Sequence, residues 1–481
     1  MFEANPAVEA VRSQIDHPVI DSDGHFFEFV PVLNEYLAQE GGETLLRDFW
    51  AAATNNEIMS NWYELTLEQK LDVRQNRPVF WSAPAENTLD YATANFPKLL
   101  YQRMDEIGLD FSVMYPGIGN VAISLGNDDV RRAGCRAFNR YFKDAFAEFP
   151  DRMRPAAIVP AHTPEEAVEE LEHAVKEQGF SVVLLPSYIK RPIRAAVRKD
   201  PSMERYAYWL DCYGVDSDYD YDPLWRKCLE LKVLPTFHSP SHGMVMRNSV
   251  TNYCYNHIGH FAAAGDAVAK SLFMGGVTAR FPELKFLFLE GGVGWARSLL
   301  ADLIGHWEKR NGEAILQFDS RRIDREKFAE LYREYGGSLF REHLAQEPLA
   351  HFNPPDESNY DDYAACNLSE KGDFIERFVE PFYFGCEADD PITTSAWDTL
   401  RNPLGAKLRA VMGSDIGHWD VPDMREVVEE CWEPVEHGQM TKADFRDFVF
   451  TNPVEFWTHN RPDFFKGTRV QDAVARAMEP A

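Results

Sequence analysis

Short apolar segments alternate with longer amphipathic segments along nearly the whole chain. Eight of the apolar segments have the length of buried strands. They are Val19–Asp23, Phe111–Tyr115, Arg154–Pro160, Ser181–Pro186, Val233–His238, Lys285–Glu290, Phe382–Cys386 and Ala410–Asp415. Helix-like segments lie between most of them, including Asp128–Glu148, Pro164–Gln178, Gly265–Thr278 and Trp295–Lys309. Alternation of strands and helices predicts an α/β fold with a parallel sheet, and eight units favour a closed (β/α)8 TIM barrel over an open sheet.

Two long segments interrupt this alternation. The first covers about residues 29–109 and is rich in Trp, Asn and Pro, and the second covers about residues 311–379. We interpret residues 1–481 as a single barrel domain that carries both segments as insertions, because segments this long usually form lids or interfaces. Residues from about 425 to 481 have helical patterns, and we expect them to pack on the barrel as a C-terminal extension.

Composition limits the classes of molecule that the protein is expected to bind. The chain has 481 residues, is 45% hydrophobic and carries a net charge of −28, which would repel nucleic acid and anionic membrane surfaces. Its seven cysteines have no paired close spacing and favour a reducing compartment over a disulfide scaffold. The N-terminus lacks a basic segment followed by an apolar one, and no stretch approaches 18 consecutive apolar residues. We therefore expect a cytoplasmic protein that acts on a small molecule.

Residues that could bind a metal ion stand at the carboxyl ends of four predicted strands. They are Asp23 and His25 on the first, His238 on the fifth, Glu290 on the sixth and Asp415 on the eighth. The active site of a barrel enzyme lies at this end of the strands. Carboxylate and imidazole groups are common ligands of divalent first-row ions. Four strand ends of this kind indicate a metal centre far more strongly than any one of them.

Each candidate also has a purely structural interpretation. His238 could be a core histidine bonded to a carbonyl, and Asp415 could cap the helix that follows it. Glu290 precedes two glycines, and such a turn can hold a glutamate for backbone bonding alone. His257 and His260 are three residues apart, which on a helix would place both on one face for binding or for packing. Sequence alone does not separate these two histidines.

Several stretches carry a resemblance to a known family. They are IDSDGHFFE, FHSPSHG, NHIGHFAAAGDAVAKSLFMGGV, FPELKFLFLEGGVGWA and MGSDIGHWDV. With them, the chain resembles the metal-dependent amidohydrolase superfamily. Within it, the chain resembles the amidohydrolase-related branch that includes aminocarboxymuconate-semialdehyde decarboxylase and the γ-resorcylate-type decarboxylases. The resemblance implies a distorted (β/α)8 barrel and one divalent ion held by Asp23, His25, His238 and Asp415.

The chain departs from the family's pattern in three places, and one is Glu290, which stands on the sixth strand where many members carry a histidine. The other two concern the hydrolytic members. They usually begin with His-x-His, whereas this chain has Asp23, which shifts weight from amide hydrolysis toward decarboxylation. No lysine ends the fourth strand, since Lys190 lies four residues beyond its proline, so one ion is the default. Zinc or manganese is the expected ion, and iron is also compatible with these ligands. Glu290, His257 and His260 are additional candidates for this ion or a second one.

The resulting hypothesis is a metal-dependent decarboxylase or hydrolase that acts on a small carboxylated or cyclic compound. Asp415, Glu290 and His418 are the catalytic candidates, with Asp415 as general acid–base. One alternative is a dinuclear-metal oxygenase or hydroxylase on the same barrel. Another is a metal-bearing, non-catalytic partner subunit of a catalytic homologue.

The aromatic content of the first insertion bears on assembly. Its Trp50, Trp62, Phe80, Trp81 and Phe96 are more aromatic surface than an isolated loop could hide, although they could also pack on their own barrel. The insertion is therefore expected to form a lid or interface, and the chain to form a homo-oligomer. A hetero-oligomer with a homologous subunit is also compatible with the insertions.

Overall fold

The computed structural model describes residues 5–54, 61–79, 83–239, 243–340 and 360–479. Eight parallel strands form one sheet in the order β1-β2-β3-β4-β7-β8-β9-β10. Their bounds are β1 Ile20–Phe26, β2 Phe111–Pro116, β3 Met153–Ile158, β4 Val182–Pro186, β7 Pro235–His238, β8 Phe286–Phe288, β9 Phe382–Glu387 and β10 Arg409–Gly413. All eight predicted strands are confirmed, with their ends shifted by a few residues.

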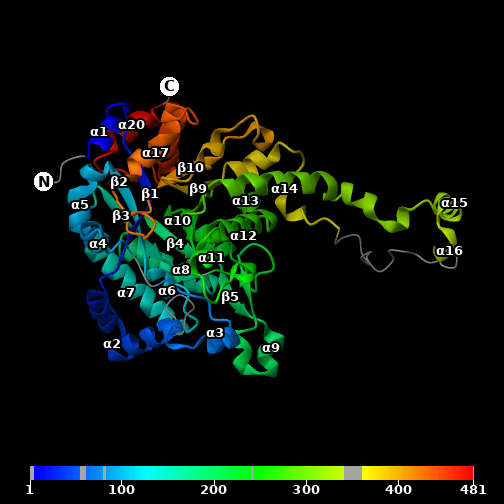
Figure 1. Ribbon diagram of the computed structural model, residues 1–481, viewed down its shortest axis with the longest axis horizontal. Helices are drawn as coiled ribbons and strands as arrows, with labels where there is room; N and C mark the ends of the chain where they lie inside the picture. Colours follow the sequence, from blue (N-terminus) through cyan, green and yellow to red (C-terminus); the bar gives the residue numbers. More distant parts are fainter. Residues whose placement is uncertain (1–4, 55–60, 80–82, 240–242, 341–359, 480–481) are drawn as a thin grey trace.

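The first and last strands meet and nearly close the sheet. The Asp415 N–H donates to the Asp23 carbonyl, and the His25 N–H donates to the Ile416 carbonyl, both over 2.9 Å. Helices surround the strands, as the alternation requires, so the predicted (β/α)8 barrel is confirmed (Figure 1). The main outer helices are α7 Asp128–Phe146, α8 Pro164–Glu172, α10 Asp222–Leu231, α12 His260–Met274 and α14 Gly294–Arg310.

Helix α7 illustrates how local sequence sets these helices. The Asn127 side chain accepts a hydrogen bond from the Val130 N–H, which caps the first turn, and Asp128 and Asp129 lie at its positive end. The buried face of α7 includes Phe138 and Phe142, at i and i+4, so the helix packs on the barrel through one stripe.

A two-stranded antiparallel hairpin follows the fourth barrel strand and was not predicted. It comprises β5 Ile189–Pro192 and β6 Tyr208–Asp211, with α9 Arg194–Lys199 between them. Its sequence contains Lys, Arg and Pro and does not have the pattern of a buried strand. A buried ion pair between Arg191 Nε and Asp211 Oδ2, 3.0 Å apart, joins its two strands, and Arg191 also donates to Tyr221 Oη outside the hairpin over 2.7 Å.

The first insertion is helical. It forms α2 Val30–Thr54, α3 Leu67–Val73, α4 Thr88–Asn95 and α5 Pro97–Ile107. Helix α2 packs along α7 and bends where Gly42 has a φ of 68°. Trp50 and Trp62 lie in this insertion, half-buried, whereas Phe96 is exposed. Phe80 and Trp81, also expected to contribute, fall outside the described residues.

The second insertion contains an arm that leaves the barrel beyond α14. It comprises α15 Arg325–Tyr335 and α16 Gly337–Phe340, and Figure 1 shows it far from the rest of the molecule. Neither helix has a buried residue. We call residues 325–340 the arm.

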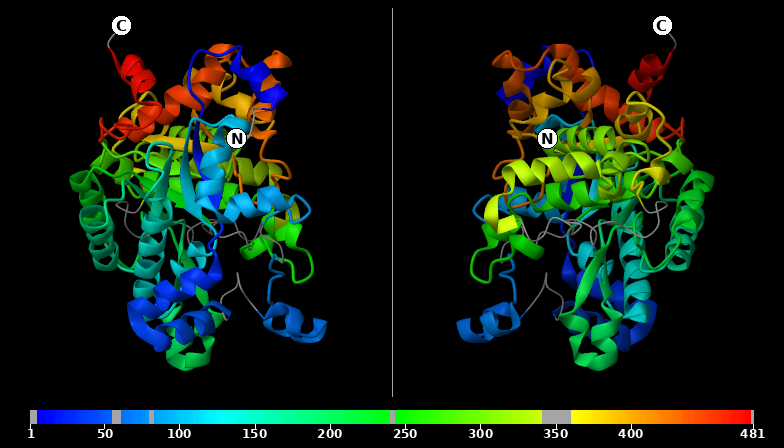
Figure 2. Two further views of the ribbon diagram at one scale, coloured as in Figure 1. Left: turned by 90° about the vertical axis from the view of Figure 1, so that its left-hand side faces the viewer. Right: turned by 90° about the vertical axis from the view of Figure 1, so that its right-hand side faces the viewer.

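The C-terminal segment covers the amino ends of the strands. It includes α17 Val427–Glu436, α18 Lys442–Arg446, α19 Asn452–Thr458 and α20 Gln471–Met478 (Figure 2). Arg461 donates to the carbonyls of Leu231 and Lys232 just before β7, and Arg154 at the start of β3 donates to the Phe464 carbonyl. This cover lies opposite the carboxyl ends, where the candidate site is found. Within the described chain, no helix has both the length and the apolar character needed to cross a membrane.

Candidate metal centre

The candidate residues from the first and last strands lie against one another. Asp23 and His25 belong to β1, which extends beyond its predicted end, and Asp415 follows β10. His25 Nε2 lies 3.1 Å from Asp415 Oδ1 and 3.5 Å from Asp23 Oδ1. All three side chains are buried, with at most 3% of their surface exposed. The β1–β10 seam therefore brings together ligands that are 390 residues apart in the chain, counted from His25 to Asp415.

The fifth and sixth strands supply the other half of the cluster. His238 ends β7, and its Nε2 lies 2.7 Å from Oε2 of Glu290, which follows β8. The His25 and His238 rings are 5.1 Å apart and nearly perpendicular. The structure thus brings Asp23, His25, His238, Glu290 and Asp415 into one buried cluster at the carboxyl ends of the strands.

Two of these carboxylates stand on left-handed backbone. Glu290 has a φ of 58° and Asp415 a φ of 50°. Such a conformation costs a non-glycine residue energy, of order 1–3 kcal/mol, and it is found at sites where a side chain must be aimed. In both cases the strand ends two residues earlier, so the tight turn directs the carboxylate back over the mouth of the barrel.

Burial and mutual repulsion disfavour the charged form of these carboxylates. Desolvation, and then the charges of Asp415 and Asp21, raise the pKa of Asp23 well above its ordinary value. Desolvation also raises the pKa of Glu290, with further contributions led by Asp415 and Glu387. For the imidazoles, desolvation is the main cause that lowers the pKa of His238 to about 3 and that of His25 well below 6.5. The cluster therefore presents neutral imidazoles beside carboxylates that a nearby cation would stabilise as anions.

Buried atoms without hydrogen-bond partners supply a direct test of whether these residues fit a metal ion. Within the described chain, they include Asp23 Oδ1, His25 Nε2, His238 Nε2, Glu290 Oε2 and both carboxylate oxygens of Asp415. Orphaned buried polar atoms are rare in folded proteins. Here they are ligand-type atoms of one cluster, and His25 with Asp23 and His238 can offer atoms that lie within 4.8 Å of one another. The residues fit a divalent ion.

Neighbouring groups orient two of the imidazoles. The His238 Nδ1–H donates to the Ser239 carbonyl over 3.1 Å, which leaves Nε2 with the lone pair that a metal ion requires. His418 stacks on His25 with ring centroids 3.6 Å apart, and its Nδ1 lies 2.5 Å from Asp415 Oδ1. His418, a catalytic candidate, therefore lies directly beside the proposed acid–base Asp415.

The structure separates the two histidines that sequence left equivalent. They do not share one face of a helix. Helix α11 (Tyr253–His257) ends before Gly259, which has a left-handed φ of 69°, and a separate helix, α12, begins at His260. His257 can offer a ligand atom within 4.8 Å of those of Glu290 and Asp420. His260 is fully buried, and its Nε2 lies 2.8 Å from Ser239 Oγ, behind the cluster.

Sequence reasoning missed Glu387, and it assigned no role to Asp420. Glu387 is the last residue of β9, so the rule that found the other strand-end ligands would have found it too. Both residues line a cavity of about 350 Å³ outside the buried cluster. Its charged lining residues are all acidic among those described, namely Glu290, Glu387, Asp389, Asp390 and Asp420, and we call this set the acidic mouth.

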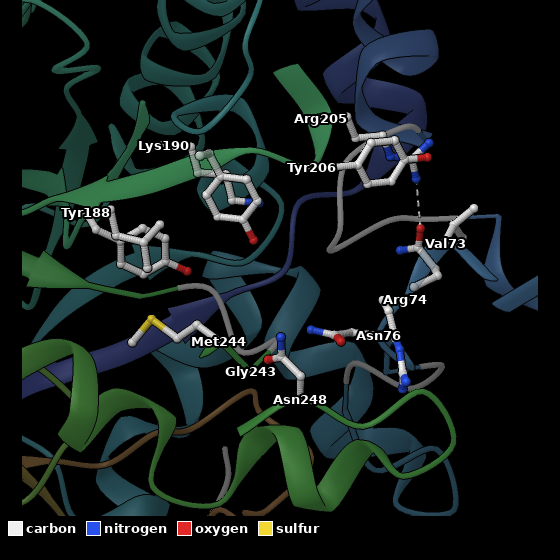
Figure 3. A pocket seen from close by; sticks show the side chains of 13 residues that line it. Val73, Arg74, Asn76, Tyr188, Lys190, Arg205, Tyr206, Gly243, Met244 and Asn248 are labelled. Carbon is white, nitrogen blue, oxygen red and sulfur yellow. Dashed lines mark hydrogen bonds between the residues drawn. The ribbon is translucent and has the colours of Figure 1, made fainter. Parts of the chain in front are cut away.

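A second pocket, of about 170 Å³, has the opposite charge (Figure 3). Its charged lining residues are Arg74, Lys190 and Arg205, with no carboxylate among the described ones, and Tyr188, Tyr206 and Tyr208 also line it. One of these residues, Tyr188, comes two residues after Pro186, which pairs with His238 in the barrel. In a chain with net charge −28, such a cationic pocket is suited to an anionic group.

Comparison with known proteins agrees with this architecture. A solved 5-carboxyvanillate decarboxylase from Novosphingobium aromaticivorans, with bound manganese, is 11% identical and has a TM-score of 0.51, covering 95% of this chain and 100% of that one. A dihydroxybenzoic acid decarboxylase from a Polaromonas species is 15% identical, with a TM-score of 0.49, covering 94% and 100%. The first of these likenesses concerns the fold alone.

Sequence comparison adds a relative and a family. A gamma-resorcylate decarboxylase from a Polaromonas species is 31% identical over 125 residues, which are 25% of this chain and only 36% of that protein. The family model described as Amidohydrolase matches residues 20–338, which include Asp23, His25, His238 and Glu290. The chain therefore belongs to the amidohydrolase family.

Proposed function

We propose that this protein is a metal-dependent lyase that decarboxylates a small carboxylated aromatic compound. The observation that carries the proposal is the buried cluster of Asp23, His25, His238, Glu290 and Asp415, which has ligand-type atoms with no hydrogen-bond partner among the described residues. The partial match to a gamma-resorcylate decarboxylase supports decarboxylation over hydrolysis. A bound divalent ion would polarise the substrate and offset the charge of its carboxylate. We assign Asp23, His25, His238 and Asp415 to this ion.

The chain's own residues would supply and place the proton. Decarboxylation breaks the bond between the ring carbon and the carboxylate carbon, CO2 leaves, and the electron pair stays on the ring carbon. A proton must then reach that carbon. The pair Asp415 and His418, with Oδ1 and Nδ1 2.5 Å apart, can hold this proton at the mouth of the barrel and deliver it. Asp415 would then regain a proton from solvent through His418, which is less buried than Asp415.

The cationic pocket supports an anionic substrate. Lys190 Nζ lies 4.9 Å from the centre of the Tyr208 ring, and Arg205 donates to Gln75 Oε1 over 3.0 Å, so tertiary contacts hold both cations. A hydroxyl or second carboxylate of a planar substrate could be bound between these cations and the tyrosine rings. Substrate recognition would then be divided between this pocket and the metal centre.

The test is an assay of the Mn²⁺-loaded protein with a panel of hydroxybenzoic acids, following CO2 release. Mn²⁺ is the first choice because the fold neighbour was solved with it. Turnover that falls at least about 100-fold in Asp415→Asn would support the assignment. His306→Ala, on the outer helix α14, is a matched control that should keep full activity. Absence of turnover on any aromatic acid, with hydrolysis of a cyclic amide or ester instead, would refute decarboxylation.

A dinuclear-metal oxygenase is the second candidate. It is favoured by the number of ligand-type residues. They form three overlapping groups, linked through His25 and Glu290, and together they are more than one ion needs. Oxygen consumption with the Fe²⁺-loaded protein would distinguish it from a decarboxylase. A protein that binds metal but has neither activity would instead fit a non-catalytic subunit of a homologous enzyme.

The arm supports assembly into a homodimer or larger oligomer. It leaves Leu331, Tyr335 and Leu339 exposed to 42%, 73% and 78% of their surface. Helices with no buried residue have little to stabilise them in water, and exposed apolar patches of this kind mark interaction sites. A second copy of the chain is the simplest partner for the arm.

A further inference from the structure

Three segments that are far apart in the chain line the cationic pocket of Figure 3. Residues 73–76 belong to the first insertion, residues 243–248 follow β7, and the β5–β6 hairpin with its connection supplies Lys190 and Arg205. We propose that this pocket is a binding site for the carboxylate group of an aromatic acid, and that Gln75 and Arg205 are the residues that bind the carboxylate.

Gln75 is the residue that calls for a ligand. Arg205 donates a hydrogen bond to Gln75 Oε1 over 3.0 Å. A guanidinium can only donate, so this bond fixes the orientation of the amide and makes Nε2 its remaining donor. Gln75 is 4% exposed, and Nε2 is buried with no hydrogen-bond partner among the described residues. Such buried donors are rare, and an N–H group requires an acceptor, which excludes a metal ion as its partner.

The charges around Gln75 favour an anionic acceptor. The charged residues that line the pocket, Arg74, Lys190 and Arg205, are all cations among the described ones. Because Arg205 and Gln75 are hydrogen-bonded to each other, their remaining N–H groups are neighbours, and two neighbouring donors match the two oxygens of a carboxylate. The net charge of −28 on the chain opposes the binding of anions, so an anion requires a local group of cations such as this one.

The size and lining of the pocket favour an aromatic ring attached to the carboxylate. Its volume is about 170 Å³, and a cavity of roughly 150 Å³ is large enough for benzene. Tyr188, Tyr206 and Tyr208 line it, and tyrosine rings pack well against other aromatic rings. A small inorganic anion would leave most of this lining without a contact.

Contacts at the edge of the pocket hold its walls in place. Arg74 has a left-handed φ of 51°, and the Gln75 N–H donates to the Lys70 carbonyl over 3.0 Å, so the turn that ends α3 fixes where Gln75 lies. The Arg77 N–H donates to the Ser249 carbonyl over 3.1 Å, which joins the first insertion to the segment after β7. Walls that are already ordered lose little freedom when a ligand binds.

The chemistry of the pocket identifies the ligand and is compatible with two sources of it. The carboxylate could be a second one on the substrate, in which case the inference rests on the proposed function. It could also belong to a separate aromatic acid, whose binding requires no reaction at the metal centre. In both cases Gln75 and Arg205 would determine the preference for a carboxylate.

Binding to the metal-free protein tests the site without any activity assay. The full chain is stripped with a chelator and titrated with benzoate in a calorimeter. Gln75→Glu and Arg205→Met are each expected to weaken binding at least about tenfold, because the first adds a negative charge in place of the donor and the second removes a cation. Arg198→Met is the matched control, since Arg198 is an exposed arginine on α9 that does not line the pocket.

Two further probes need only the wild type. Benzamide, the neutral analogue of benzoate, is expected to bind at least about tenfold more weakly, and inorganic phosphate should also bind more weakly than benzoate. The proposal would be overturned by the absence of benzoate binding, by equal affinity for benzoate and either probe, or by wild-type affinity in Gln75→Glu and Arg205→Met.

Aromatic dicarboxylates distinguish the two sources. Isophthalate and terephthalate, whose carboxylates differ in separation, are titrated into the metal-free and the Mn²⁺-loaded protein. If the pocket binds a second carboxylate of the substrate, Mn²⁺ should tighten binding of one of them at least about tenfold, and Arg205→Met should remove this gain. Equal affinities with and without Mn²⁺ would assign the pocket to a separate aromatic acid. Because no turnover is measured, failure of the decarboxylase proposal would leave these results unaffected, and the reverse also holds.

Discussion

Asp21 on the first barrel strand accepts two hydrogen bonds from Ser414, which follows the last strand. Its Oδ1 accepts from the Ser414 N–H over 2.9 Å, and its Oδ2 accepts from Ser414 Oγ over 2.8 Å. Oδ2 also accepts from Ser112 Oγ on β2 over 2.6 Å. This fully buried carboxylate therefore links β1 to β2 and to the residue that follows β10, two residues before Asp23 and one residue before Asp415 in those segments.

Asp21→Asn should destabilise the protein, because the amide supplies one acceptor oxygen where the carboxylate supplies two. We expect the free energy of unfolding to fall by about 3 kcal/mol, the size of losing a buried hydrogen bond to a charged group together with its unsatisfied donor. Urea unfolding of the metal-free protein would measure this. Ser414→Ala, which removes only the hydroxyl, should cost about 1 kcal/mol, and equal effects of the two variants would contradict the role assigned to Asp21.

Gly413→Ala should weaken metal binding with little effect on the rest of the fold. A Cβ at Gly413 would lie 2.8 Å from the Asp23 Cβ, so Asp23 would have to move. A displacement of this size should reduce Mn²⁺ affinity at least about tenfold, or about 1.4 kcal/mol. Gly305→Ala, where a Cβ meets nothing within 4 Å, is the matched control. Calorimetric titration with Mn²⁺ would decide, and unchanged affinity would mean that Asp23 is not a ligand.

His238→Ala should lose the metal ion of the buried centre. The wild type should gain about 2.7 kcal/mol in unfolding free energy at a Mn²⁺ concentration 100 times the dissociation constant, since only the folded state presents the site. The variant should show little of this gain. Thermal unfolding with and without Mn²⁺, and with a chelator, would measure both. The same gain in wild type and variant would exclude His238 as a ligand.

Glu28 should make stability depend on pH. Its carboxylate accepts hydrogen bonds from the N–H groups of Ile118 and Gly119, and burial raises the pKa of Glu28 from 4.5 to about 7. Between these values the folded state keeps a proton that the unfolded state has lost. The stabilisation is therefore complete below about pH 4.5 and lost as the pH rises toward 7.

Glu28→Gln removes this titration. Its unfolding free energy should fall less steeply than that of the wild type between pH 5 and 7, by up to about 1.4 kcal/mol per pH unit. Urea unfolding of both metal-free proteins at several pH values would compare the slopes. Parallel slopes would show that Glu28 does not hold a proton in this range.

Charge on the arm should disrupt assembly. Tyr335→Asp with Leu339→Asp places two carboxylates on its exposed apolar surface, and burying them against a partner would be costly. We expect the wild type to sediment as a dimer or larger species and the double variant as a single 55.1 kDa chain. Leu400→Asp, at a leucine 87% exposed elsewhere on the surface, should leave the assembly intact. A wild type that sediments as one chain would rule out the oligomer.

The sequence by itself determined the barrel and brought together most of the candidate centre. Buried parallel strands read as short apolar segments, and their carboxyl ends meet at one end of a barrel, so the pattern alone groups Asp23, His25, His238, Glu290 and Asp415. Each of these signals is local. A strand and the polar residue that follows it lie within a few positions in the chain.

Only the tertiary structure decided the features that depend on distance between segments. The β5–β6 hairpin joins two strands without a strand-like pattern, and a buried ion pair between Arg191 and Asp211 links them. The spacing of His257 and His260 did not distinguish them. The helix ends before Gly259, so His257 lies near Glu290 and Asp420, whereas His260 contacts Ser239. The acidic mouth joins residues from the ends of β8, β9 and β10. Ion pairs and metal coordination act between atoms a few ångströms apart. When the residues lie on different segments, their spacing along the chain does not specify the distance between them.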